Sequence, residues 1–119
     1  MIEDATPFPF SRDYAEARSR FREACAAAGV SVRPYENPCR GPEGEPLTMD
    51  AAWFGAPDAD RVLVTISATH GVEGFCGAGV QVDWVDRHGR DPLPADLAVL
   101  HLHALNPYGF AWVRRVNED

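Results

Sequence analysis

Lysine is missing from this sequence altogether, so arginine supplies every basic side chain. The 11 basic residues are outnumbered by 18 acidic ones, which leaves a net charge of −7. Nucleic acids and anionic membrane surfaces attract basic proteins, so neither is expected as a partner. The sequence also lacks any apolar run that approaches the roughly 18 residues of a membrane-spanning helix.

Cysteine is scarce as well. Cys25, Cys39 and Cys76 cannot all pair with one another, and their spacing fits neither a zinc knuckle nor a CxxC redox motif. The opening sequence MIEDATPFPF has no basic segment and no apolar segment of the kind that forms a secretory signal. These features predict a cytoplasmic protein with reduced thiols. A length of 119 residues is enough for one small domain.

The pattern of apolar residues predicts two helices and four strands. The first helix is capped by Ser11 and runs to about Ala28, and the second covers Gly74–Gly89. The strands are predicted over Val30–Glu36, Leu47–Gly55, Arg61–Ala68 and Leu97–Leu105. Residues 37–46 are rich in turn-forming residues and predict a surface loop, and NPYG at 106–109 predicts a turn.

The strand Arg61–Ala68 is apolar on both faces, which is typical of a central strand in an α/β sheet. Together with the second helix and the last strand it predicts a right-handed βαβ unit with a parallel pair. The two earlier strands would add an antiparallel hairpin at the edge. The predicted fold class is therefore α/β, a three-layer mixed sheet with helices on both faces.

Chemistry is indicated by THGVEG, which follows the best predicted strand. In open α/β sheets, ligands bind beyond the carboxyl ends of the strands, where His70 and Glu73 lie. Imidazole nitrogen and carboxylate oxygen are both zinc ligands, and a catalytic zinc keeps three protein ligands and an open position. The HxxE pattern alone is weak evidence. A surface histidine and a solvated glutamate at a helix start explain it equally well.

Two longer stretches, SATHGVEGFCGAGVQ and HALNPYGFAWVRRVNED, carry a family resemblance. They resemble an uncharacterised domain family in the zinc carboxypeptidase-like clan, which also holds succinylglutamate desuccinylase and aspartoacylase. The resemblance covers about Val62 to Asp119. It implies that His70 and Glu73 bind Zn²⁺. It also implies that Arg114 or Arg115, with a slight preference for Arg115, polarises a scissile carbonyl.

The implied activity is that of a zinc-dependent hydrolase, a metallocarboxypeptidase or an N-acyl amino acid amidohydrolase. Its substrate would be a small molecule or peptide with an amide next to a free carboxylate. Two alternatives are a zinc-dependent esterase and a truncated, non-catalytic metal-binding module.

The same family continues with Asp-Leu-Asn-Arg, then a third zinc ligand (a histidine) and a general base (a glutamate). None of these follows Asp119, so residues 1–119 are expected to be the N-terminal part of one domain, inactive alone and able to form a homo-oligomer. His103 is a minor alternative as a local ligand, against a core histidine bonded to a carbonyl. Cys76 is expected to pack in the first turn of its helix.

Overall fold

The computed structural model describes residues 7–115 of the chain. It contains three helices and four strands in the order α1 Tyr14–Ala27, β1 Val32–Arg40, β2 Pro46–Gly55, β3 Arg61–Ile66, α2 Gly74–His88, β4 Leu97–His103 and α3 Pro107–Ala111. The predicted helices and strands are all present. The prediction missed α3, which occupies the segment expected to be a simple turn.

Helix α1 begins two residues later than the sequence suggested, with its cap at position 13 and not at position 11. Its N-cap is Asp13, whose side chain accepts a hydrogen bond of 2.8 Å from the Glu16 backbone N–H. The prediction that Ser11 caps this helix is therefore wrong. Aspartate is as good an N-cap residue as serine, and Ser11 and Asp13 lie only two positions apart, so the sequence alone did not distinguish them. The buried face of α1 follows the predicted spacing, with Tyr14, Ala17, Phe21 and Cys25 all turned inward.

The four strands form one mixed sheet in the order β1-β2-β4-β3. Strands β3 and β4 are parallel, and β2 is antiparallel to both β1 and β4, as the predicted βαβ unit and hairpin require. Strand β1 runs on to Arg40, into the predicted loop, and its register with β2 shifts between Asn37 and Arg40. Within the described part of the chain β3 is an edge strand, paired with β4 alone, so the central position predicted for it stays a prediction.

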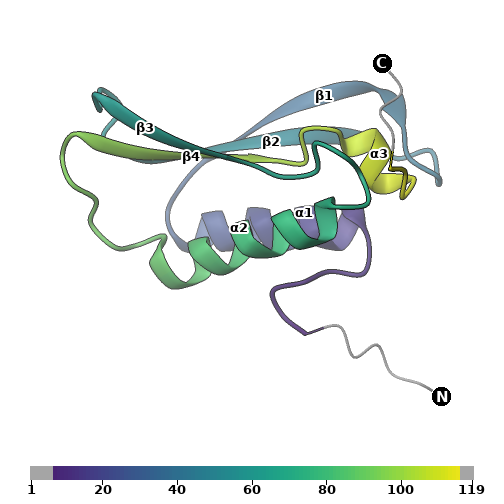
Figure 1. Ribbon diagram of the computed structural model, residues 1–119, viewed down its shortest axis with the longest axis horizontal. Coiled ribbons are helices and arrows are strands. Elements are labelled where there is room, and N and C mark those ends of the chain that lie inside the picture. Colours follow the sequence, from purple (N-terminus) through teal and green to yellow (C-terminus); the bar gives the residue numbers. More distant parts are fainter. Residues whose placement is uncertain (1–6, 116–119) are drawn as a thin grey trace.

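Helices α1 and α2 lie side by side against one face of the sheet, and α3 lies at one end of it (Figure 1). Residues 7–115 therefore show two layers, with no helix over the second face of the sheet. None of their helices combines the length and the apolar character that crossing a bilayer would require.

The core between the helices and the sheet has two parts. The part at the end near α3 includes Tyr14, Leu47, Ala68, Ala104 and Phe110, all at most 5% exposed. The other part is built around Phe21, Phe54, Val82 and Val99. The first of these clusters lies directly under the ends of β3 and β4, so it supports the segment that carries the predicted site.

Candidate metal-binding corner

The ends of β3 and β4 are fastened together by hydrogen bonds that continue past both strands. The hydroxyl of Ser67 accepts a 2.9 Å bond from the Ala104 backbone N–H, and its carbonyl accepts another of 2.9 Å from Leu105. Ala68 and Ala104 both adopt left-handed backbone conformations, with φ of 55° and 62°. Non-glycine residues are uncommon in this region, and strain of this kind often accompanies functional sites.

Helix α3 interlocks with the THGVEG loop through glycines. A Cβ atom at position 71 would lie 2.0 Å from the carbonyl carbon and oxygen of Gly109, so only glycine fits there. Gly109 in turn donates a 3.0 Å bond to the side chain of Asn106, which caps α3. The Val72 N–H donates to the Arg114 carbonyl at 3.2 Å, and Arg114 donates to the Gly109 carbonyl at 2.7 Å. The two sequence motifs thus form one structural unit.

His70 and Glu73 lie on this unit, between β3 and α2. His70 is partly buried, and its Nδ1 atom is fully buried without a hydrogen-bond partner. Glu73 is the N-cap residue of α2, yet its side chain makes no capping bond and stays 57% exposed. Its carboxylate is free of the helix N-H groups and can bind something else.

Arg115 and Glu73 come together at this corner. The Arg115 Nη1 atom lies 3.7 Å from Glu73 Oε1, and both side chains are more than half exposed. Such an exposed ion pair contributes at most about 1 kcal/mol. The pair matters for the position of Arg115, because it places a cation next to a candidate metal ligand. The main chain of Arg114 holds the loop instead, through its bond with Val72.

His101 and His103 point the other way, into the core under α1 and α2. His103 is fully buried and stacks on Phe21 at 4.8 Å between ring centroids. Neither of its ring nitrogens has a hydrogen-bond partner, so the predicted bond to a carbonyl is absent. Burial lowers the pKa of His101 to about 4. Burial, with the nearby Arg18 cation, lowers the pKa of His103 to about 3.

Across residues 7–115, no group of three or more His, Cys, Asp and Glu side chains is arranged to hold a metal ion. His103 therefore does not complete a ligand set with His70 and Glu73. Cys76 is exposed, so the expectation that it packs in the first turn of α2 is wrong. Cys25 is buried, and burial together with the nearby Asp50 raises its pKa to about 12, which keeps this thiol protonated and unreactive.

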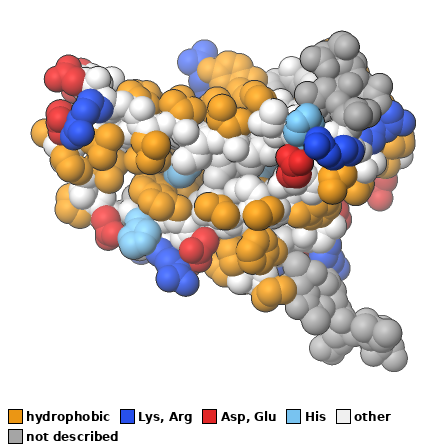
Figure 2. All heavy atoms as spheres, viewed as in Figure 1, with side chains coloured by type: hydrophobic (Ala, Val, Ile, Leu, Met, Phe, Trp, Pro, Cys, Tyr) orange, Lys and Arg blue, Asp and Glu red, His pale blue; other side chains and the backbone are white. Residues whose placement is uncertain are grey.

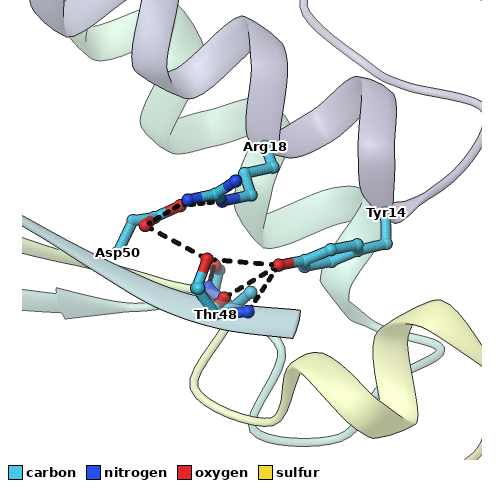
Figure 3. A network of polar contacts seen from close by, with 6 residues as sticks. Tyr14, Arg18, Thr48 and Asp50 are labelled. Carbon is cyan, nitrogen blue, oxygen red and sulfur yellow. Dashed lines mark hydrogen bonds and ion pairs between the residues drawn. The ribbon is translucent and has the colours of Figure 1, made fainter. Parts of the chain in front are cut away.

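A second polar cluster, under α1, was not predicted. Asp50 is fully buried on β2 and accepts a 2.8 Å bond from Arg18 Nε, while the Tyr14 hydroxyl exchanges bonds with the backbone of Thr48 (Figure 3). An open groove of about 960 Å³ runs beside this cluster, between α1 and the starts of β1 and β2. None of the predicted site residues lines it. The sequence held one signal of this cluster: Asp50 is a charged residue at an inward-facing position of the alternating strand β2.

The sheet and its helices resemble solved enzyme structures. Glutaminyl cyclase from Fimbriiglobus ruber superposes with a TM-score of 0.51 at 14% identity, over 74% of this chain and 36% of that one. Glutaminyl cyclase from Porphyromonas gingivalis gives a TM-score of 0.46 at 17% identity, over 71% and 34%. Cytosol aminopeptidase from Coxiella burnetii gives 0.43 at 13% identity, over 76% and 26%.

At these identities the likeness to the Fimbriiglobus ruber enzyme shows a shared fold. The chain spans about a third of the length of the glutaminyl cyclases that it matches. Among curated proteins no significant match is found. Residues 10–119 match a family described as "Protein of unknown function (DUF2817)", which is nearly the whole sequence. The chain belongs to this family.

Proposed function

We propose that His70 and Glu73 are two of the ligands of a Zn²⁺ ion in a hydrolase related to the zinc carboxypeptidase-like clan. One observation carries this proposal. The buried Nδ1 of His70 has no hydrogen-bond partner, and it belongs to the same short loop as a carboxylate that does not cap its helix. Buried polar atoms are almost always satisfied, so an unpartnered one at a strand end calls for an explanation.

The donor types fit zinc, which accepts imidazole nitrogen and carboxylate oxygen. They do not complete the site, because the described residues offer no third donor. We place the third ligand and the general base in sequence beyond residues 1–119, which then form the N-terminal part of one domain. In that whole protein, further helices would cover the second face of the sheet and give three layers. We place the protein in the cytoplasm.

Bound zinc would supply an activated water near neutral pH. The residues of this chain would hold the ion and position the substrate. Arg115, already next to Glu73, has a planar guanidinium that can grip a carboxylate with two bonds or steady a carbonyl oxygen that gains charge. An amide with a free carboxylate nearby, such as a peptide C-terminus or an N-acyl amino acid, matches this pairing.

The experiment is a measurement of zinc affinity and stoichiometry by titration calorimetry and metal analysis. His70→Ala and Glu73→Gln should each weaken zinc binding by at least about tenfold. His88→Ala is the matched control, because His88 is an exposed histidine paired with Asp91 at the far end of α2. Unchanged zinc stoichiometry in His70→Ala, with His88→Ala also unchanged, would reject the assignment.

A second candidate, a metal-binding module without catalysis, is favoured by the missing third donor in residues 7–115. Turnover separates it from the hydrolase. A hydrolase cleaves N-acyl amino acids in a zinc-dependent way that Arg115→Met impairs, whereas the module binds zinc and cleaves nothing. Parallel amide and ester substrates separate the amidohydrolase from an esterase.

A further inference from the structure

The side chain of Trp112 links the end of α3 to the far strand of the sheet. Its indole N–H donates a hydrogen bond of 2.9 Å to the Arg40 carbonyl at the end of β1, 72 residues away in the sequence. Helix α3 lies at this end of the sheet (Figure 1), and histidine, basic and acidic side chains gather on the surface there (Figure 2). The zinc site proposed above makes no use of this bond.

The end of β1 holds the accepting carbonyl in a fixed position. The register with β2 shifts between Asn37 and Arg40, and within this irregularity the Cys39 N–H donates a 2.9 Å bond to the Asn37 side chain. Just beyond it, the Gly41 N–H donates a 2.9 Å bond to the Glu45 carbonyl and closes the hairpin. Bulges of this kind redirect a strand and are common next to functional sites. The carbonyl that Trp112 binds is therefore a fixed anchor.

The segment after Trp112 turns back toward α3. Val113 has a left-handed backbone with φ of 55°, which is an uncommon conformation for a β-branched residue. The turn lets the Arg114 N–H donate a 2.7 Å bond to the Gly109 carbonyl. A strained backbone persists only where the surrounding contacts hold it, and the bond from Trp112 to β1 is such a contact. Trp112 therefore stabilises this turn.

The turn in its place holds the loop that carries the proposed zinc ligands. The Arg114 carbonyl accepts a 3.2 Å bond from the Val72 N–H. Val72 follows His70 by two residues and directly precedes Glu73. We propose that Trp112 is a positioning residue for these ligands: by binding the end of β1 it fixes the turn whose Arg114 carbonyl holds their loop. This role rests on the proposed zinc site. Because the Trp112 bond is exposed, its loss should disturb the loop more than the fold.

Two substitutions each remove one link of this chain of contacts. Trp112→Phe removes the indole N–H and keeps an aromatic ring. Val72→Pro removes the N–H that binds the Arg114 carbonyl. Val72 is the second residue of a turn that is closed by a 3.0 Å bond from the Gly74 N–H to the Gly71 carbonyl. Proline is favoured at this position of a turn, so the substitution removes the bond without distorting the loop.

Amide hydrogen exchange in the intact protein tests the link without any metal. Trp112→Phe should speed the exchange of the Val72 and Arg114 N–H groups by at least about fivefold, because the turn that fixes both of them opens more often. The Asn106 N–H lies at the same corner but donates to the Ala68 carbonyl, at 2.9 Å. Its exchange should therefore stay at the wild-type rate.

Trp53→Phe is the matched control. It removes an equivalent bond, of 3.1 Å from the indole N–H to the Ala56 carbonyl, at the opposite end of the sheet. It should leave the exchange at the corner unchanged. Wild-type exchange of Val72 in Trp112→Phe overturns the proposal. Equal acceleration at Asn106 overturns it as well, because Trp112 would then contribute only to general stability.

Zinc affinity of the intact protein, measured by titration calorimetry, tests the consequence for the site. Trp112→Phe and Val72→Pro should each weaken zinc binding by about fivefold. The double variant should bind zinc no more weakly than the weaker single variant, because both substitutions act through the same turn. Additive losses, or wild-type affinity in both single variants, overturn the positioning role. A wild-type protein that binds no zinc rejects the zinc site itself, and the exchange rates then decide by themselves if Trp112 holds the loop.

Discussion

The two edges of the sheet are built in opposite ways. Strand β1 is nine residues long and carries Arg33, Glu36 and Arg40, with prolines at 34 and 38 and a register shift near its end. Charges, prolines and bulges are the usual means by which proteins keep an edge from pairing. Strand β3 is six residues long, has no proline, and exposes aliphatic side chains on both faces. Within residues 7–115, β1 therefore has the features that discourage further pairing, and β3 does not.

The same asymmetry continues beneath the sheet. On the β1 side, α1 is anchored to β2 by the Tyr14–Thr48 bonds and the Arg18–Asp50 ion pair (Figure 3). On the β3 side, α2 is tied mainly through Gln81, whose amide donates to Thr65 and to the Leu102 carbonyl. The β1 side is thus stabilised within the chain by specific polar contacts.

The largest effect should come from breaking the anchor on the β1 side. Asp50→Ala leaves the Arg18 guanidinium, only a quarter exposed, without its partner. Removing one member of such a pair costs about 3–5 kcal/mol in the free energy of unfolding. Urea denaturation followed by circular dichroism measures this loss.

The matched control replaces both partners. Arg18→Met combined with Asp50→Leu removes the charges and keeps the volume, and should recover most of the lost stability. If Asp50→Ala unfolds at the wild-type urea midpoint, the Arg18–Asp50 ion pair does not stabilise the β1 side of the sheet.

An intermediate loss of stability should come from lowering the pH, which protonates two buried histidines on β4. His101 and His103 have folded-state pKa values of about 4 and 3, below the ordinary value of 6.5. The unfolded chain therefore binds protons more readily, so their contribution to stability is complete above pH 6.5 and is lost as pH falls toward 4. We expect each histidine to lose roughly 2 kcal/mol of stabilisation between pH 7 and pH 5.

Urea denaturation at a series of pH values measures this slope. His103→Leu should flatten it, whereas His88→Ala, which changes an exposed histidine, should leave it as in the wild type. A wild-type chain whose stability does not change between pH 7 and pH 5 would contradict the buried, neutral state of the two rings.

The smallest effect on stability should come from removing the protection of β1. Pro34→Thr with Glu36→Val changes two exposed residues, so the free energy of unfolding should move by less than about 0.5 kcal/mol. Association should nevertheless increase, because the edge loses a proline and a charge. Light scattering at constant concentration measures this. No rise in scattering would mean that these residues do not protect the edge.

The helices and strands were predictable because their periodic apolar residues also form the core. The buried face of α1 and the parallel pairing of β3 with β4 followed from spacing alone. Helix α3 was missed because its five residues are too few for a periodic signal, although Asn-Pro is a helix-start pattern. The extension of β1 was missed because prolines at an edge still permit pairing with one neighbour.

The corner was predictable only in part. The sequence places His70 and Glu73 beyond a strand, but their use as zinc ligands remains a prediction. The contact of Arg115 with Glu73 depends on how α3 turns the chain back, which no local pattern encodes. A strand that is apolar on both faces, such as β3, predicts a neighbour on each side, and residues 7–115 supply one of the two, β4.

Ala68 and Ala104 reverse a familiar rule of protein engineering. Glycine normally loosens a chain, by about 0.5–1 kcal/mol relative to alanine. Here both alanines hold a left-handed conformation that alanine resists by about 1–2 kcal/mol, so glycine would relax the backbone rather than weaken it. Both methyl groups are buried in the cluster beneath the corner. The backbone strain at these two strand ends is thus offset by burial of the two methyl groups, which packs the loop against the core.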